Sequence, residues 1–154
     1  MDGLRAVLFS NLYEIHKIKG TITLIGLSDP NFTLKGDMFG EAPAMVSAKL
    51  SSLVDDESSY TILLSHRPEL FESYAHCNID LVLSGHAHGG QFRLPFIGGL
   101  IAPDQGIFPK YDAGLFTNGS TNMIVSRGLG NSIIPIRFNN RPEVIVIELL
   151  NTGL

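Results

Sequence analysis

The sequence predicts an α/β fold (of the α+β kind), in which helices flank a mixed β-sheet. Three features support this: closely spaced strand-type segments near the amino terminus, an amphipathic helical segment after them, and a strand–helix–strand unit in the middle. Hydrophobic residues make up 44% of the 154 residues and charged residues 17%, which is enough apolar material for a packed core. We therefore expect one ordered domain over residues 1–154.

The first third of the chain predicts strands followed by a helix. Residues 6–9 form a short apolar run, residues 13–18 alternate polar and apolar side chains, and residues 21–27 are apolar and β-branched. The last two patterns are typical of strands. Pro43 suits the first turn of a helix, and apolar side chains then recur at helical spacing, so we expect a helix over residues 42–54.

The middle of the chain predicts two neighbouring parallel strands. Residues 61–65 and 80–84 are strands of the buried type, and a helix begins between them at Pro68 with acidic residues in its first turn. A right-handed crossover of this kind places the carboxyl ends of both strands at the same edge of the sheet. His66 follows the first strand directly and His86 follows the second after one glycine. Because neighbouring strands lie only about 4.8 Å apart, we expect the two histidines to meet at an edge where ligands gather.

The carboxyl-terminal part predicts a long loop and further strands. Residues 89–118 are rich in Gly, Pro and aromatic residues with little periodicity, which favours a functional loop. Residues 123–126 form the next expected strand. Residues 133–138 and 144–150 predict a closing hairpin.

Three histidines, His66, His86 and His88, form the candidate metal site. His88 lies two residues beyond His86 among glycines, which permit the tight turn that would direct both rings inward. Imidazole binds zinc, manganese, iron and nickel. A single strand-end histidine is more often a hydrogen-bonded structural residue, so the hypothesis depends on the convergence of all three. His16 and His76 lack this context and are interpreted as surface or half-buried residues.

Composition argues against other classes of protein. The net charge is −4 and Lys and Arg form no cluster, so no nucleic-acid partner is expected. The single cysteine, Cys77, excludes a disulfide framework within the chain and a cysteine-rich zinc site. No apolar run approaches the roughly 20 residues that span a bilayer, so we predict no membrane segment and a cytoplasmic location for this chain.

Two segments resemble the last metal-binding blocks of calcineurin-like metallophosphoesterases: Leu64-Ser65-His66-Arg67-Pro68-Glu69 and Gly85-His86-Ala87-His88-Gly89-Gly90-Gln91. The second is similar to the Gly-His-x-His-Gly-Gly-Gln signature of a bacterial branch, whose full-length members are often membrane-anchored or exported. Residues 25–29, 126–130, 135–138 and 141–143 also fit that branch.

The resemblance implies half of a four-layer α/β/β/α sandwich with a two-metal centre at the strand ends. His66 and His86 would bind one divalent metal and His88 the other, the metals being manganese, zinc or iron. They would hydrolyse a phosphate monoester or diester substrate by in-line displacement.

The resemblance also suggests where substrate would lie. The loop over residues 92–118 would border it. The turn at Gly89, Gly90 and Gln91 and the side chain of Arg127 are candidates for contacting it, and a structural ion pair is an equally good interpretation of Arg127.

The family's upstream metal-binding blocks have no counterpart in this sequence, so the resemblance implies a partial domain with no catalytic residue of its own. One interpretation is a phosphoesterase completed by an amino-terminal fragment or a longer precursor. A second is an inactive, truncated remnant that binds metal weakly and self-associates as a homo-oligomer. A third, unrelated reading is a His-rich module with a regulatory metal.

Overall fold

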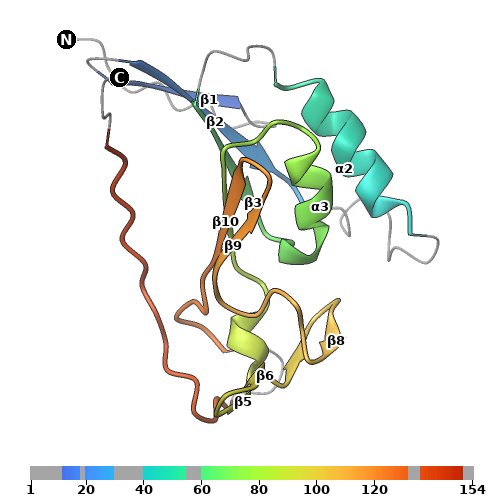
Figure 1. Ribbon diagram of the computed structural model, residues 1–154, viewed down its shortest axis with the longest axis vertical. Coiled ribbons are helices and arrows are strands. Elements are labelled where there is room, and N and C mark those ends of the chain that lie inside the picture. Colours follow the sequence, from blue (N-terminus) through green and yellow to red (C-terminus); the bar gives the residue numbers. More distant parts are fainter. Residues whose placement is uncertain (1–11, 18–19, 30–39, 55–59, 132–135, 151–154) are drawn as a thin grey trace.

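The computed structural model describes residues 12–17, 20–29, 40–54, 60–131 and 136–150, and its centre is a six-stranded sheet (Figure 1). The strand order is β1-β2-β3-β4-β10-β9. The central strands β2, β3, β4 and β10 run parallel, and the edge strands β1 and β9 are antiparallel to their neighbours. The expected mixed α/β fold is therefore confirmed. The bounds are β1 Leu12–Lys17, β2 Gly20–Leu27, β3 Tyr60–Ser65, β4 Leu81–Ser84, β9 Gly114–Asn118 and β10 Thr121–Val125.

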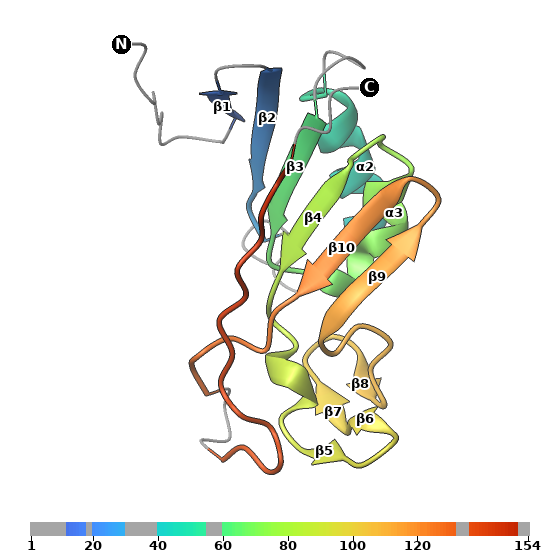
Figure 2. The same cartoon turned by 60° about the vertical axis from the view of Figure 1, so that its left-hand side comes forward.

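Two helices pack against one face of the sheet (Figures 1 and 2). Helix α2 spans Ala42–Ser51 with a proline in its first turn, as predicted, but it ends before residue 54. Helix α3 spans Phe71–Ala75 and is preceded by the 3₁₀ turn η1, Pro68–Leu70. No helix in the described ranges is long and apolar enough to span a membrane.

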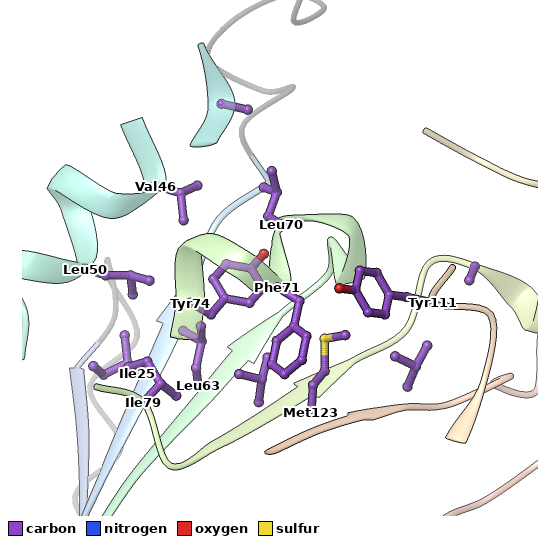
Figure 3. Packing of buried hydrophobic residues seen from close by; sticks show 14 of the residues in the cluster. Ile25, Val46, Leu50, Leu63, Leu70, Phe71, Tyr74, Ile79, Tyr111 and Met123 are labelled. Carbon is purple, nitrogen blue, oxygen red and sulfur yellow. The ribbon is translucent and has the colours of Figure 1, made fainter. Parts of the chain in front are cut away.

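The core lies between the two helices and the sheet (Figure 3). Tyr74 and Phe71 of α3 are 0% and 1% exposed, so they are as deeply buried as the strand residues beneath them. Cross-strand pairing aligns those strand residues on one face, because Leu63 pairs with both Ile25 and Val82. The apolar residues of this layer are Ile25, Leu63, Val82, Met123 and Val125 from the strands, and Val46 and Leu50 from α2.

The second face of the sheet is also apolar but is only partly covered. Leu64 lies between Gly26 and Leu83 in the ladder and is 39% exposed, and Leu115 on the edge strand is 66% exposed. In the described part of the chain no helix covers this face. Parallel strands are normally buried on both faces, so this face has the character of a surface that another layer would cover.

The long segment after β4 is more regular than its composition suggested. It begins with the 3₁₀ turn η2, His88–Gly90, and it contains two small hairpins before β9. One hairpin pairs β5, Arg93–Leu94, with β6, Gly98–Gly99. The other pairs β7, Ile101–Ala102, with β8, Gly106–Ile107.

The predicted closing hairpin is wrong for the residues that the structure describes. Residues 144–150 belong to no helix or strand, and Val146 is 89% exposed. Phe138 instead forms a bridge with Phe92, and its backbone exchanges hydrogen bonds with Gln91 and Arg93. Phe138, the last residue of the expected first strand, is therefore paired with the loop and not with residues 144–150. Residues 6–9, 18 and 133–135 of the predicted strands lie outside the described residues.

Candidate metal centre

The ends of β3 and β4 are fastened together beneath the candidate site. The Ser84 hydroxyl donates a hydrogen bond to the backbone carbonyl of Ser65 at 2.7 Å. The buried Tyr74 hydroxyl donates to the carbonyl of Arg67 at 2.7 Å and lies 2.7 Å from the Ser65 hydroxyl. Together with the parallel pairing of the strands, these bonds fix the backbone from which His66 and His86 project.

His66 and His86 lie in direct contact at the end of these strands. The Nε2 atom of His66 is 2.8 Å from the Nδ1 atom of His86, and the ring centroids are 4.4 Å apart. His66 is exposed and the His86 side chain is 15% exposed, so both rings are at least partly accessible to solvent. The juxtaposition expected from the crossover is therefore present in the structure.

His88 lies in the same region but its ring is turned toward the later chain. Its ring forms a hydrogen bond with the backbone of Gly130. His86 and His88 have φ values of 62° and 47°, which are uncommon for residues other than glycine. Strained backbone of this kind persists only where the surrounding packing maintains it, and it is found most often at functional sites.

Tight packing around two glycines maintains this turn. A side chain at Gly89 would approach the Asn140 Oδ1 atom to 2.5 Å, and one at Gly90 would approach the Cα of Gly99 to 2.3 Å. Both glycines are buried, as is Gln91. The Asn140 side chain also donates to the carbonyl oxygens of His88 and Gln91 at 2.7 and 3.2 Å. In this structure these residues therefore shape the turn that carries the histidines.

Arg127, the other candidate for contacting substrate, forms an ion pair. Its Nε atom donates to the Glu143 carboxylate at 2.7 Å, and its backbone N–H donates to the same oxygen at 3.3 Å. Hydrogen bonding to Arg127 lowers the pKa of Glu143 below its usual value. This pair connects the end of β10 to the carboxyl-terminal segment.

A group of charged residues that the sequence interpretation missed lies beside the histidines. The Asp104 carboxylate is 2.9 Å from the His86 Nε2 atom and 3.4 Å from the buried guanidinium of Arg67. Arg67 also pairs with Glu69 and, at 3.3 Å, with Asp29 at the end of β2. Arg67 could have been found because it directly follows His66. Asp104 carries no sequence signal, since it lies in a hairpin turn far along the chain.

Burial favours the neutral imidazoles that metal binding requires. Burial lowers the pKa of His66, and the neighbouring His86 lowers it further. Burial also lowers the pKa of His88, although the hydrogen bond of its ring to the Gly130 backbone raises it in part. A neutral ring offers one nitrogen lone pair to a cation.

The donor set fits part of a metal site. The facing nitrogens of His66 and His86 are close enough to share one cation. In the described ranges, no group of three or more His, Cys, Asp or Glu residues could hold a metal. Neutral imidazoles also leave the charge of a divalent ion uncompensated. The residues described here therefore fit two ligands of one metal, and further ligands would have to come from elsewhere.

Comparisons with known proteins find bacterial relatives whose names indicate phosphoesterases. The chain is 42% identical over 94 residues to the uncharacterized metallophosphoesterase YkuE of Bacillus subtilis, a match that covers 61% of this chain and 32% of YkuE. It is 39% identical over 89 residues to the phosphodiesterase YaeI of Escherichia coli, which covers 58% of this chain and 32% of YaeI.

A longer match is to the uncharacterized protein YpbG of Bacillus subtilis, 32% identical over 148 residues, covering 90% of this chain and 52% of YpbG. The chain thus spans about a third to a half of the length of these curated relatives. No protein-family model and no solved structure matches the chain.

Proposed function

We propose that this chain, a relative of the bacterial metallophosphoesterases, supplies histidine ligands to the metal centre of a phosphoesterase. The observation that carries the proposal is the 2.8 Å approach of the His66 and His86 ring nitrogens at the ends of neighbouring parallel strands. Both rings are accessible to solvent, and the name of the relative YaeI supports a phosphate ester, specifically a diester, as substrate.

The roles of the chain's own residues follow from this geometry. His66 and His86 would bind one divalent metal, for which manganese, zinc and iron are candidates. His88 would bind a second through the ring nitrogen that does not face Gly130. Bound metal would polarise the phosphate oxygens and supply an activated water. The turn over Gly89, Gly90 and Gln91 holds the two later histidines in place.

Further ligands would come from polypeptide outside this chain. Two imidazoles on one metal and one on the other fall short of the three or four protein ligands of a firm site. The partly covered second face of the sheet supports the same conclusion, because Leu64 and Leu115 are 39% and 66% exposed. We therefore propose that residues 1–154 form a partial domain, completed by an amino-terminal fragment or a longer precursor.

The test is to place this chain in a complete enzyme. A chimaera of the relative YaeI, in which this chain replaces the matching region, is assayed for manganese-dependent hydrolysis of bis(p-nitrophenyl) phosphate. We expect activity in the chimaera, its loss in the His86→Ala variant, and its retention in the control His76→Ala. The isolated chain should be inactive. Equal activity of the His86→Ala and His76→Ala chimaeras would refute the proposal. Activity of the isolated chain would show that it needs no further polypeptide.

The exposed apolar residues also favour a second candidate, an inactive remnant that self-associates. Val144, Val146 and Leu150 are 73%, 89% and 73% exposed in an extended segment. Such a segment can pair with a second copy of itself. A chimaera without activity, together with a stable oligomer of the isolated chain in analytical ultracentrifugation, would favour this candidate.

A further inference from the structure

We infer that Asp104 is a positioning residue that holds the His86 ring by its Nε2 atom and leaves Nδ1 as the nitrogen that binds metal. This inference rests on the proposed function and adds a role for the loop between β4 and β9. Asp104 belongs to neither of the two sequence segments that carry the histidines.

The two nitrogens of the His86 ring have different partners. Nε2 lies 2.9 Å from the Asp104 Oδ2 atom, and Nδ1 lies 2.8 Å from the His66 Nε2 atom. An ionised carboxylate only accepts hydrogen bonds, so the ring must carry its proton on Nε2. In a neutral ring the lone pair then lies on Nδ1, on the side of His66. The carboxylate therefore selects the tautomer in which the two histidines can share a cation.

Asp104 lies on the wrong side of the ring to be a ligand of the same metal. Its contact is with Nε2, whereas the facing nitrogens of His66 and His86 lie on the other side. Metal-binding histidines commonly donate their second N–H to a carboxylate, which fixes the ring and makes it a better ligand.

The position of Asp104 is fixed from two directions. Its carboxylate lies 3.4 Å from the guanidinium of Arg67, whose side chain is 6% exposed and is itself held by Asp29 and Glu69. Arg67 thereby connects Asp104 to the ends of β2 and β3.

The turn that carries Asp104 is anchored separately. Asp104 has a φ of 57° in the turn between β7 and β8. The adjacent Gln105 side chain donates to the Tyr111 carbonyl at 3.0 Å and accepts from the Tyr111 N–H at 2.9 Å. Tyr111 is 5% exposed and packs edge-on against Phe71 of α3. The hairpin is therefore fastened to the core.

The alternative for Asp104 is an ordinary surface ion pair with Arg67, because its side chain is 38% exposed. The two roles predict different results for Asp104→Ala. A surface pair affects stability slightly and leaves the His86 ring unchanged. A positioning residue controls the proton on Nε2 and the affinity for metal.

The experiment is NMR on the chain labelled with ¹⁵N-histidine, with His86 signals assigned by a His86→Gln variant. In the wild type we expect a slowly exchanging Nε2–H signal from His86, and in Asp104→Ala we expect exchange to broaden it. The matched control Glu148→Gln removes one negative charge from an exposed position and should leave the signal intact. An unchanged Nε2–H signal in Asp104→Ala, or a proton on Nδ1 in the wild type, would overturn the inference.

Titration with Co²⁺ gives the second measurement and separates the inference from the proposed function. Loss of a carboxylate behind a metal-binding histidine lowers affinity about 10–100-fold, and we expect this for Asp104→Ala at an unchanged melting temperature. Equal Co²⁺ affinity in the wild type and Asp104→Ala would overturn the positioning role and leave the histidine site standing. A wild type that retains the Nε2–H signal without binding Co²⁺ would support the contact with Asp104 and would count against a metal site formed by His66 and His86 of this chain alone.

Discussion

The substitution Gly90→Ala tests how the turn that carries the histidines is built. Gly90 has a φ of 71°, and a Cβ added there would lie 2.3 Å from the Cα of Gly99. Carbon atoms in favourable contact are separated by about 3.5–4 Å. The nearest atoms, the Cα and C of Gly99, are backbone atoms, so no side chain can rotate away and strand β6 would have to move.

The expected cost has two parts. A left-handed backbone costs a residue other than glycine about 1–2 kcal/mol, and overpacking of a close contact costs about 1–3 kcal/mol. We therefore expect Gly90→Ala to lower the free energy of unfolding by about 2–5 kcal/mol. This is a large share of the stability of a small domain.

Two control substitutions separate these parts. Gly128 has a φ of 65° with no atom within 4 Å of an added Cβ, so Gly128→Ala should show the backbone cost alone. Gly85 has an ordinary φ and open space, so Gly85→Ala should change stability little. Urea unfolding followed by circular dichroism measures all three variants. If Gly90→Ala loses no more stability than Gly128→Ala, the close packing of Gly90 on Gly99 is refuted.

Three further predictions concern the surroundings of the site. Tyr74→Phe removes a buried hydroxyl with two hydrogen bonds and should cost about 1–3 kcal/mol in urea unfolding; a loss below about 0.5 kcal/mol would contradict this. Glu143→Gln should cost about 0.5–1 kcal/mol at pH 7. Hydrogen bonding to Arg127 lowers the pKa of Glu143 in the folded chain, so the stability from this ion pair is present above the usual pKa of a glutamate and is lost as the pH falls through the lowered pKa. The difference in stability between Glu143→Gln and the wild type should therefore vanish in acid, and a difference independent of pH would contradict this prediction. If the chain self-associates, Val146→Lys should reduce the association measured by sedimentation with little change in stability, since Val146 is 89% exposed. If the variant associates as strongly as the wild type, residues 144–150 do not form the contact between copies.

The contact between His66 and His86 could be predicted because local rules determine it. Hydrophobic runs identified β3 and β4, and the handedness of the crossover made them parallel neighbours, which the strand pairing confirms. Both histidines follow their strands within two residues, so little chain is left to redirect them.

The segment between β4 and β10 could be predicted only in part. Strand β9 was included in the expected loop, although Gly119-Ser120 between it and β10 is a two-residue hairpin signal. Asp104 could not have been assigned to the site, because its place depends on contacts of Gln105 with Tyr111 and of Tyr111 with the core.

The closing hairpin failed for a different reason. Residues 144–150 have the composition of a strand, but they belong to no strand of the described chain, and Phe138 at the end of the expected partner strand pairs with the loop at Phe92. Composition shows that a segment can form a strand, and only tertiary contacts decide whether it finds an edge.

Paramagnetic broadening of histidine ring signals by substoichiometric Mn²⁺ tests most directly whether His66 and His86 share a metal. His76 is the internal control, because it is exposed directly after the end of α3 and its Nδ1 atom lies 2.7 Å from the Glu72 carbonyl oxygen. The proposed centre predicts that the ring signals of His66 and His86 broaden first, while that of His76 stays sharp. Equal broadening of all three, or sharp His66 and His86 signals beside a broadened His76, would contradict it.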